Sequence, residues 1–326
     1  MKNGSGIRLI RFDEVYILGL FLILFAIMSV FSPSFLTAYN LKNLLCTASI
    51  TGIMACGMTA VMATGGIDIA VGSTLGLGGA ISAYVLSSMT TPSAWMVGVV
   101  MLMSVAVCGL VGLINGFVIT KFNVPPLLAT MGMQRTVRGL VYLVTGGKAI
   151  FFREEIPAYR WIGSGYVGTI PTLVIFFFLV ALGMGWILKK TIYGRYLCSI
   201  GLNKDASYLS GVNTRRVTFS AYVICGLMAG LSGVILSSRL NSATPDAGVS
   251  YETTAITAIV LGGNSLTGGK ASIFGAVIGI FIMVMLSNWL NLVGMQSIYQ
   301  KIVTGTVLIL VIVADRVTGL RGKLTR

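Results

Sequence analysis

KKTIYGRYLCSIGLNKDASYLSGVNTRR, residues 189–216, is the longest polar interruption in the second half of a chain that otherwise consists of apolar runs. It carries six basic residues against one acid, Asp205. An excess of Lys and Arg in a short loop is typical of the cytoplasmic side of a membrane protein. We therefore predict that this segment faces the cytosol.

Two short helices are predicted within this segment. Apolar residues between Thr191 and Ile200 recur at spacings of three and four, and Gly201 is a suitable stop. Asn203 is suited to cap a second helix, Lys204 to Ser210, which would end at Gly211. Ordered structure in a cytoplasmic loop favours a docking site for a partner, and a solvated connector is the alternative.

The composition indicates a polytopic membrane protein. Of its 326 residues, 56% are hydrophobic and 10% charged, against roughly 25% charged residues in soluble domains. The basic residues that give the net charge of +14 are distributed over the predicted loops and not clustered on one folded face, which argues against a nucleic-acid partner. With no histidine, and five cysteines without a C-x-x-C pair, neither a metal site nor a disulfide frame is predicted.

Ten apolar runs suggest ten transmembrane helices, so we predict an all-α fold with a single transmembrane domain, 1–326. The run near 253–261 is short for a crossing of about 20 residues, which indicates either an earlier start or a broken helix. The runs lie at about 15–31, 44–64, 71–87, 94–120, 127–144, 170–188, 217–237, 253–261, 273–290 and 298–314.

The charge distribution predicts the orientation. With both termini in the cytoplasm, fifteen basic residues lie inside and six outside, in keeping with the excess of positive charge on the inner side. The segment 145–169 is then periplasmic. Ten spans divide into five and five, and an odd number in each half makes an internal repeat inverted, as in many transporters.

Several polar residues within or beside the runs are candidates for a structural or pathway role. Asp68, the one acid between Glu14 and Glu154, is best interpreted as a helix cap, although it could instead receive backbone N–H groups or pair with a basic residue. Arg135 and Arg138 are three apart and share a helix face, which should meet a cavity, a partner or the interface because a charge in lipid is costly. The amides of Asn115, Gln134 and Asn288 are expected to line a route or to bond across helices.

LGGNSLTGGK, residues 261–270, is superficially similar to a phosphate-binding loop. Asn264 stands where that loop needs a glycine, and Ala271 replaces the Ser or Thr that would hold magnesium. We therefore predict no nucleotide site and no cofactor in this chain, and Asn264 remains a structural or pathway candidate. An enzyme is not predicted either, since the chain lacks histidine and an H-E-x-x-H motif.

Four segments carry a resemblance to a known family. GGIDIAVGS (65–73), NGFVITKFNVPPLLATMGM (115–133), YGRYLCSIGLNKDASYLSGVN (193–213) and LGGNSLTGGKASIFGAVIG (261–279) resemble, in order, segments of the permease subunits of ribose-type ATP-binding-cassette (ABC) sugar importers. This family includes ribose, galactose, arabinose and autoinducer-2 permeases. Ser207 departs from the family pattern, where a second alanine is usual, and so does Ala271, where a glycine is usual.

The resemblance implies a function and partners. The chain would be one of two permease subunits, alike or different, in the lipid of a bacterial inner membrane. It would work with cytoplasmic ATPase domains, which hold ATP and magnesium, and with a periplasmic sugar-binding protein that delivers a monosaccharide, a ribose-like pentose or a hexose. The loop received by the ATPase would comprise Gly194, Arg195, Gly201, Asn203, Lys204, Asp205, Ala206, Ser210 and Gly211.

An ion-coupled secondary carrier of a small polar solute is the alternative. Such a carrier normally holds a carboxylate within the membrane, whereas we expect all nine acids of this chain in loops or at the ends of spans. Asp68 or Glu252 would favour the carrier if either lay deeper than predicted.

Overall fold

The computed structural model describes residues 12–152 and 156–324, and most of this part of the chain is helical. Two short antiparallel strand pairs connect loops: β1 (Ile150–Phe151) with β4 (Ser242–Ala243), and β2 (Tyr166–Val167) with β3 (Ile170–Pro171). The helices are α1 (Phe12–Phe31), α2 (Ala38–Ala63), α3 (Val71–Ser87), α4 (Ala94–Phe122), α5 (Pro126–Thr145), α6 (Pro157–Ser164), α7 (Thr172–Lys190), α8 (Ile192–Leu202), α9 (Lys204–Leu209), α10 (Thr214–Leu240), α11 (Tyr251–Leu261), α12 (Ile273–Leu292) and α13 (Ser297–Leu324).

Each of the ten predicted apolar runs coincides with one of these helices, so the all-α membrane fold is confirmed. Five of the described helices are long and apolar enough to cross a membrane: α2, α4, α7, α10 and α12. Apolar stretches in α1, α3, α11 and α13 are shorter. The number of crossings and their orientation stay predictions.

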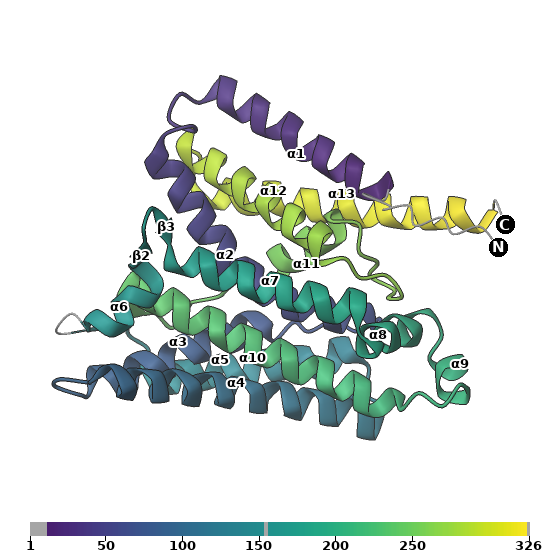
Figure 1. Ribbon diagram of the computed structural model, residues 1–326, viewed down its shortest axis with the longest axis horizontal. Coiled ribbons are helices and arrows are strands. Elements are labelled where there is room, and N and C mark those ends of the chain that lie inside the picture. The colour runs from purple at the N-terminus through teal and green to yellow at the C-terminus, as the bar shows by residue number, and fades with distance from the viewer. Residues whose placement is uncertain (1–11, 153–155, 325–326) are drawn as a thin grey trace.

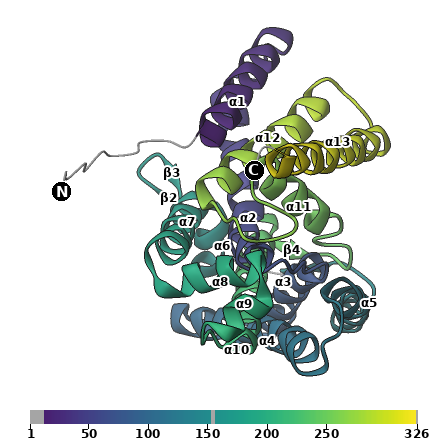
Figure 2. The ribbon, with the colours of Figure 1, turned by 90° about the vertical axis from the view of Figure 1, so that its right-hand side faces the viewer.

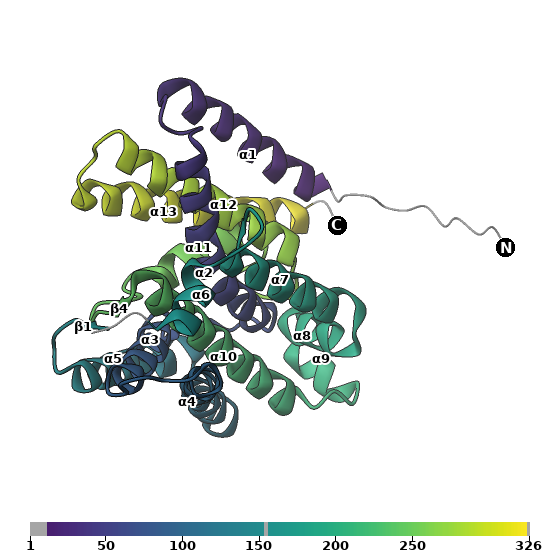
Figure 3. The ribbon, with the colours of Figure 1, turned by 60° about the vertical axis from the view of Figure 1, so that its left-hand side comes forward.

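The helices form an elongated bundle with two distinct ends. The start of α1, the end of α13, and α8 and α9 lie at one end, on the right of Figure 1 and facing the viewer in Figure 2. At the opposite end lie α6 and the strands, and Figure 3 shows β1 and β4 there beside α3 and α5. The predicted topology requires such an arrangement, with the start of α1, the end of α13 and the segment 189–216 on one side and α6 with the strands on the other.

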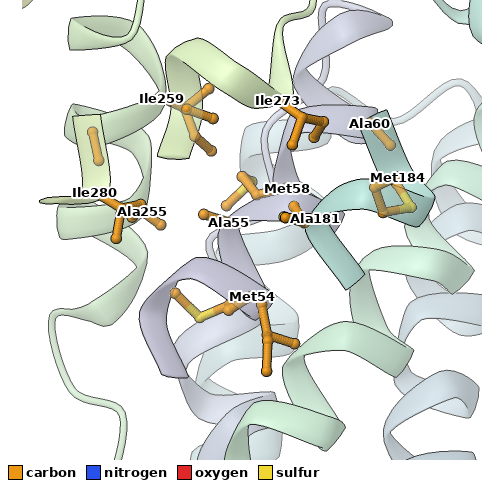
Figure 4. Packing of buried hydrophobic residues seen from close by; sticks show 14 of the residues in the cluster. Met54, Ala55, Met58, Ala60, Ala181, Met184, Ala255, Ile259, Ile273 and Ile280 are labelled. Atoms are coloured by element: carbon orange, nitrogen blue, oxygen red, sulfur yellow. The ribbon is translucent and has the colours of Figure 1, made fainter. Parts of the chain in front are cut away.

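Helix α2 runs through the middle of the bundle and is the centre of its apolar core. Met54 and Met58 of α2 are fully buried, and Figure 4 shows them among side chains of α7, α11 and α12 such as Ala181 and Ile259. The methionines fill the space between helices, as expected for unbranched side chains in irregular gaps.

Glycines allow α4 and α10 to meet backbone to backbone. A Cβ at Gly112 of α4 would lie 2.2 Å from the Tyr222 carbonyl oxygen, and one at Gly226 of α10 would lie 2.5 Å from the Cys108 carbonyl oxygen. Membrane helices without a hydrophobic driving force pack through such close contacts. This tight pair carries Asn115, and α10 begins directly after the segment 189–216.

Candidate functional site: a coupling surface and a buried polar core

The two helices predicted within 189–216 are present as α8 and α9. The predicted stop at Gly201 is wrong by one residue, because α8 continues to Leu202 and ends at Asn203. The Asn203 side chain accepts a hydrogen bond from the Ala206 N–H at 2.9 Å, which confirms it as the cap of α9. Helix α9 ends at Leu209, and Gly211 adopts the left-handed conformation (φ +85°) that ends helices.

The surface of α8 and α9 that points away from the bundle is rich in apolar side chains. Leu202, Tyr208 and Leu209 are 76%, 69% and 84% exposed. Ala206 is exposed beside them, whereas Ser207 is the buried residue of α9. We call Leu202, Ala206, Tyr208 and Leu209 the coupling surface.

Charged residues surround this surface. Arg195, Lys204 and Asp205 are exposed, while Gly194 is buried against the Leu188 carbonyl, where a Cβ would come within 2.2 Å. A hollow runs along α9 and reaches the end of α4. Its lining consists of Asn123, Lys204, Asp205, Tyr208, Gly211, Val212, Asn213, Thr214 and Arg215.

The coupling surface is joined to the bundle by a set of glycines. A Cβ at Gly201 would lie 2.1 Å from the Ala63 carbonyl oxygen and 2.3 Å from the Gly269 nitrogen. Gly269 donates its N–H to that same carbonyl at 3.0 Å, and Gly268 packs on Gly65. We call Ala63, Gly65, Gly201, Gly268 and Gly269 the glycine joint, since it connects α8 with the end of α2 and with the loop before α12.

A contact between two hydroxyl groups also attaches α8 to the bundle. The Tyr193 hydroxyl of α8 lies 2.8 Å from the Ser220 hydroxyl of α10. Burial raises the pKa of Tyr193, so the phenol stays protonated and keeps this contact. Helix α8 is thus fixed to both α2 and α10.

Asp68 lies in the loop between α2 and α3 and is buried, with 3% of its surface exposed. Its Oδ1 accepts hydrogen bonds from the Ala70 N–H at 2.9 Å and from Asn115 Nδ2 of α4 at 3.4 Å. The carboxylate therefore closes the turn that precedes α3, although Ala70, not Asp68, is the N-cap residue. Asn115 therefore bonds from α4 to the loop between α2 and α3, close to the predicted bond across helices, and its predicted place in a route stays a prediction.

Arg135 and Arg138 lie three residues apart on one helix, α5, as expected, but their surroundings differ. Arg138 is half-buried, and its Nη1 donates to the carbonyl oxygens of Pro245 and Ala247, both at 2.8 Å. Arg135 is exposed. The carbonyl groups before α11 draw Arg138 inward, a contact that sequence spacing does not reveal.

Glu252 is a residue of this core that sequence analysis placed at the end of a span. It lies in the first turn of α11 with 8% of its surface exposed, and its Oε1 accepts a hydrogen bond from Gln134 Nε2 at 3.1 Å. Asp68 in its loop and Glu252 at the start of a helix lie where acids were expected, but both side chains are buried, which the sequence did not indicate. Hydrogen-bond donors from α5, α4 and the α3 turn make that burial tolerable.

The two remaining candidate amides bond within the fold. Asn288 of α12 and Asn40 of α2 exchange hydrogen bonds through their side chains, at 2.8 and 3.0 Å. Asn264 donates to the carbonyl oxygens of Ile259 and Ser272 and so closes the loop between α11 and α12. Both contacts tie the fold together.

Comparisons with known proteins identify the family of this chain. The profile of a family described as "Branched-chain amino acid transport system / permease component" matches residues 40–312. The chain belongs to this permease family. Its relatives include the ribose import permease of Escherichia coli K12, 39% identical over 296 residues, covering 90% of this chain and 91% of that protein.

Two further relatives extend the range. The ribose import permease of Bacillus subtilis is 40% identical over 312 residues, covering 94% and 95% of the two chains. The L-arabinose transport system permease of Escherichia coli K12 is 34% identical over 316 residues, covering 93% and 90%. No solved structure matches the permease. The resemblance to ribose-type ABC permeases is confirmed.

Proposed function

We propose that this permease moves a monosaccharide of the pentose class into the cytoplasm of a bacterium. A periplasmic binding protein delivers the sugar, and ATP hydrolysis on separate subunits drives its passage through the inner membrane. The names of the relatives, ribose and L-arabinose permeases, support a pentose. The family description names branched-chain amino acids, so leucine belongs among the solutes to be tested.

The coupling surface carries this proposal. Leu202, Tyr208 and Leu209 are exposed among charged residues on α8 and α9, which lie at one end of the bundle. Apolar side chains exposed together on an otherwise polar surface mark protein contacts. A cytoplasmic ATPase is the partner that an importer needs at this end.

The loop 262–272 supports the assignment of ATP and magnesium to that partner. The Gly269 N–H, which a phosphate loop would offer to the nucleotide, is bonded to the Ala63 carbonyl. Gly268 is packed on Gly65 and Gly201, so this loop is closed against the bundle. A nucleotide site on a separate ATPase chain is consistent with this geometry.

The exposed side of helix α5 is an argument for a second permease subunit, either identical to this chain or related to it. This side carries Gly132, Arg135, Thr136 and Gly139, while Val137 faces the core. A charge in lipid at the bilayer centre costs about 2.5–3.5 kcal/mol on insertion scales. We propose that this side lines the sugar route between the two subunits.

The opposite end offers a surface for the binding protein. Arg239 bonds to the neutral side chains Asn43 and Thr47, and the Lys42 Nζ lies 5.5 Å from the centre of the Tyr166 ring. The pocket they share contains two cations and no carboxylate, so it suits an acidic partner. Its lining consists of Tyr39, Lys42, Asn43, Cys46, Gly163, Ser164, Tyr166, Pro171 and Arg239.

An ion-coupled carrier is the second candidate, because Asp68 and Glu252 are buried as such a carrier would require. The surroundings of Glu252 weaken this candidate. Arg138, a permanent cation, lies beside that carboxylate and donates hydrogen bonds to the carbonyl oxygens of Pro245 and Ala247. Asp68 is held by two hydrogen bonds from within the chain.

Uptake by membrane vesicles tests the proposal. Vesicles that contain the permease and its ATPase are loaded with ATP and supplied with candidate binding proteins and labelled ribose, arabinose or leucine. We expect sugar uptake that continues when a protonophore collapses the proton gradient and stops when ATP is omitted. Uptake that depends on the gradient and not on ATP would establish the carrier instead, and uptake of leucine alone would replace the sugar.

A further inference from the structure

A row of polar contacts ties α5 to the non-helical segment that precedes α11 and to the first turn of α11. Gln134 Nε2 donates to Glu252 Oε1 at 3.1 Å, Arg138 Nη1 donates to two carbonyl oxygens at 2.8 Å, and the Tyr142 hydroxyl donates to Asp246 Oδ1 at 2.8 Å. The three donors are four residues apart and therefore form one stripe along α5. All their acceptors lie within residues 245–252. We call this set of contacts the α5 strap.

Helix α3 encloses the strap from the other side. A Cβ at Gly72 would lie 2.1 Å from Glu252 Oε2, and one at Gly76 would lie 2.7 Å from the Ala247 carbonyl oxygen and 3.2 Å from Arg138 Nη1. These two glycines, one helical turn apart, leave room for the charged side chains. The segment is thus held between a flat face of α3 and the donor stripe of α5.

The segment satisfies only part of its own backbone, with the N–H groups of Ala247 and Val249 bonded to the carbonyl oxygens of Thr244 and Asp246. Helix α11 has 11 residues and starts at Tyr251, and the chain before it turns through left-handed conformations at Gly248 (φ +77°) and Ser250 (φ +67°). Non-helical backbone inside a membrane bundle needs partners from neighbouring helices. Arg138 supplies them for the carbonyl groups of Pro245 and Ala247.

The exposed side of α5, which borders the stripe that carries the strap, is the side that we propose lines the sugar route. Arg135 and Thr136 lie there, next in sequence to Gln134. Whatever fixes the rotation of α5 therefore also fixes which side chains face the route. The strap provides such a fixation, because it holds one stripe of α5 at three successive positions.

Building on the proposed function, we propose that Gln134 and Arg138 are positioning residues for transport. They bind the segment 245–252 to α5 so that both move as one unit and present Arg135 and Thr136 to the sugar. The inference concerns the geometry of the route, and it does not require either side chain to touch the sugar.

Exchanging the amide of Gln134 with the carboxylate of Glu252 tests this proposal in the complete complex of permease, ATPase and binding protein. Gln134→Glu places a second carboxylate against Glu252, and like charges at this separation repel. We expect uptake to fall at least roughly tenfold, the usual consequence of losing a buried hydrogen bond to a charged group. Adding Glu252→Gln restores one carboxylate and one amide, so the double variant should recover most of the uptake.

Matched controls separate positioning from folding. Gln134→Leu removes the donor without adding a charge, in case the first variant does not accumulate. Gln300→Leu removes a similar amide on α13, where Gln300 donates to Asn291 Oδ1 at 2.7 Å, and should leave uptake within about twofold. Expression and ATPase co-purification are measured for every variant. A double variant no better than Gln134→Glu alone would overturn the proposal.

A second readout reports the rotation of α5 directly. A cysteine at Thr136, in a chain whose half-exposed Cys46 and Cys198 are replaced by serine, is labelled with a water-soluble thiol reagent. We expect the labelling rate to change several-fold when Gln134→Leu is added, while a cysteine at exposed Ser88 labels as before. Equal rates at residue 136 with and without Gln134→Leu would show that the strap does not position this side of α5.

The unaltered complex shows which claim has failed. If it transports no sugar with ATP, the proposed function fails, whatever the variants do. If it transports normally and Gln134→Leu does too, with unchanged labelling at residue 136, only the positioning role fails.

Discussion

Gly201 of α8 is in direct contact with Ala63 at the end of α2, so closely that a Cβ at residue 201 would lie 2.1 Å from the Ala63 carbonyl oxygen. Helix α8 also carries the coupling surface. Under the proposed function, movement of an ATPase against Leu202 would reach α2 through this contact, which leaves no space for a side chain.

The first prediction is that Gly201→Ala weakens the link between ATP hydrolysis and transport. The added methyl group must push α8 away from Ala63 and Gly269, whereas alanine in a helix interior would otherwise be favoured by about 0.5–1 kcal/mol. The number of sugar molecules moved per ATP hydrolysed, in the reconstituted complex, should fall several-fold. Gly183→Ala on α7 is the control, because nothing lies within 4 Å of its Cβ position. Equal coupling ratios in the two variants would contradict the role of the glycine joint.

The second prediction concerns Ala206 in the coupling surface. Ala206→Glu puts a bulky charge into the ATPase contact, where overpacking costs about 1–3 kcal/mol. Position 206 is the third helical residue after the Asn203 cap, where an acid favours the helix, so α9 itself should be preserved. ATPase co-purification and sugar uptake should both drop sharply. Ala94→Glu, at the exposed start of α4, is the matched control, and normal transport by Ala206→Glu would end the assignment of the coupling surface.

The third prediction concerns the buried carboxylate of Asp68. Asp68→Leu leaves the Ala70 N–H and the Asn115 amide without their acceptor, which should lower the free energy of unfolding by about 1–3 kcal/mol. Asp68→Asn keeps an oxygen at that place and should cost less. Thermal unfolding in detergent compares the two with Asp205→Asn, whose side chain is exposed. Equal losses for both Asp68 variants would show that the hydrogen bonds are not what stabilises the turn.

The fourth prediction is the orientation of the bundle. A membrane-impermeant thiol reagent added to intact cells should label a cysteine placed at Lys148 and leave one placed at Lys204 unmodified. Both positions are exposed, and their elements, β1 next to Lys148 and α9 with Lys204, lie at opposite ends of the bundle (Figures 1 and 3). The cysteine at residue 204 should react after the cells are broken. Modification of residue 204 from outside would reverse the topology.

Features set by local pattern were predictable from the sequence. The apolar runs gave helices in their correct places, and the cap at Asn203 followed from its side chain alone, because an N-cap contact reaches only three residues ahead. The structural role of Asp68 before α3 was predictable for the same reason, because the Ala70 N–H that it binds is only two residues away.

Contacts between distant residues were not predictable in this way. Gln134 and Glu252 are 118 residues apart, and Asn40 and Asn288 are 248 apart. Nothing in the spacing of either pair indicates that the two side chains meet. The different burial of Arg135 and Arg138 has the same origin, because Arg138 binds the carbonyl group of Pro245, which is 107 residues away in sequence.

The central claim is that ATP hydrolysis on a partner, transmitted through α8 and α9, moves a sugar through this permease. Proteoliposomes that contain the permease and its ATPase, with the binding protein and labelled pentose outside and nucleotide inside, test it most directly. We predict pentose accumulation with ATP, none with a non-hydrolysable ATP analogue, and none with ATP when the permease carries Ala206→Glu. Accumulation with the analogue, or undiminished accumulation by the Ala206→Glu permease, would contradict the account.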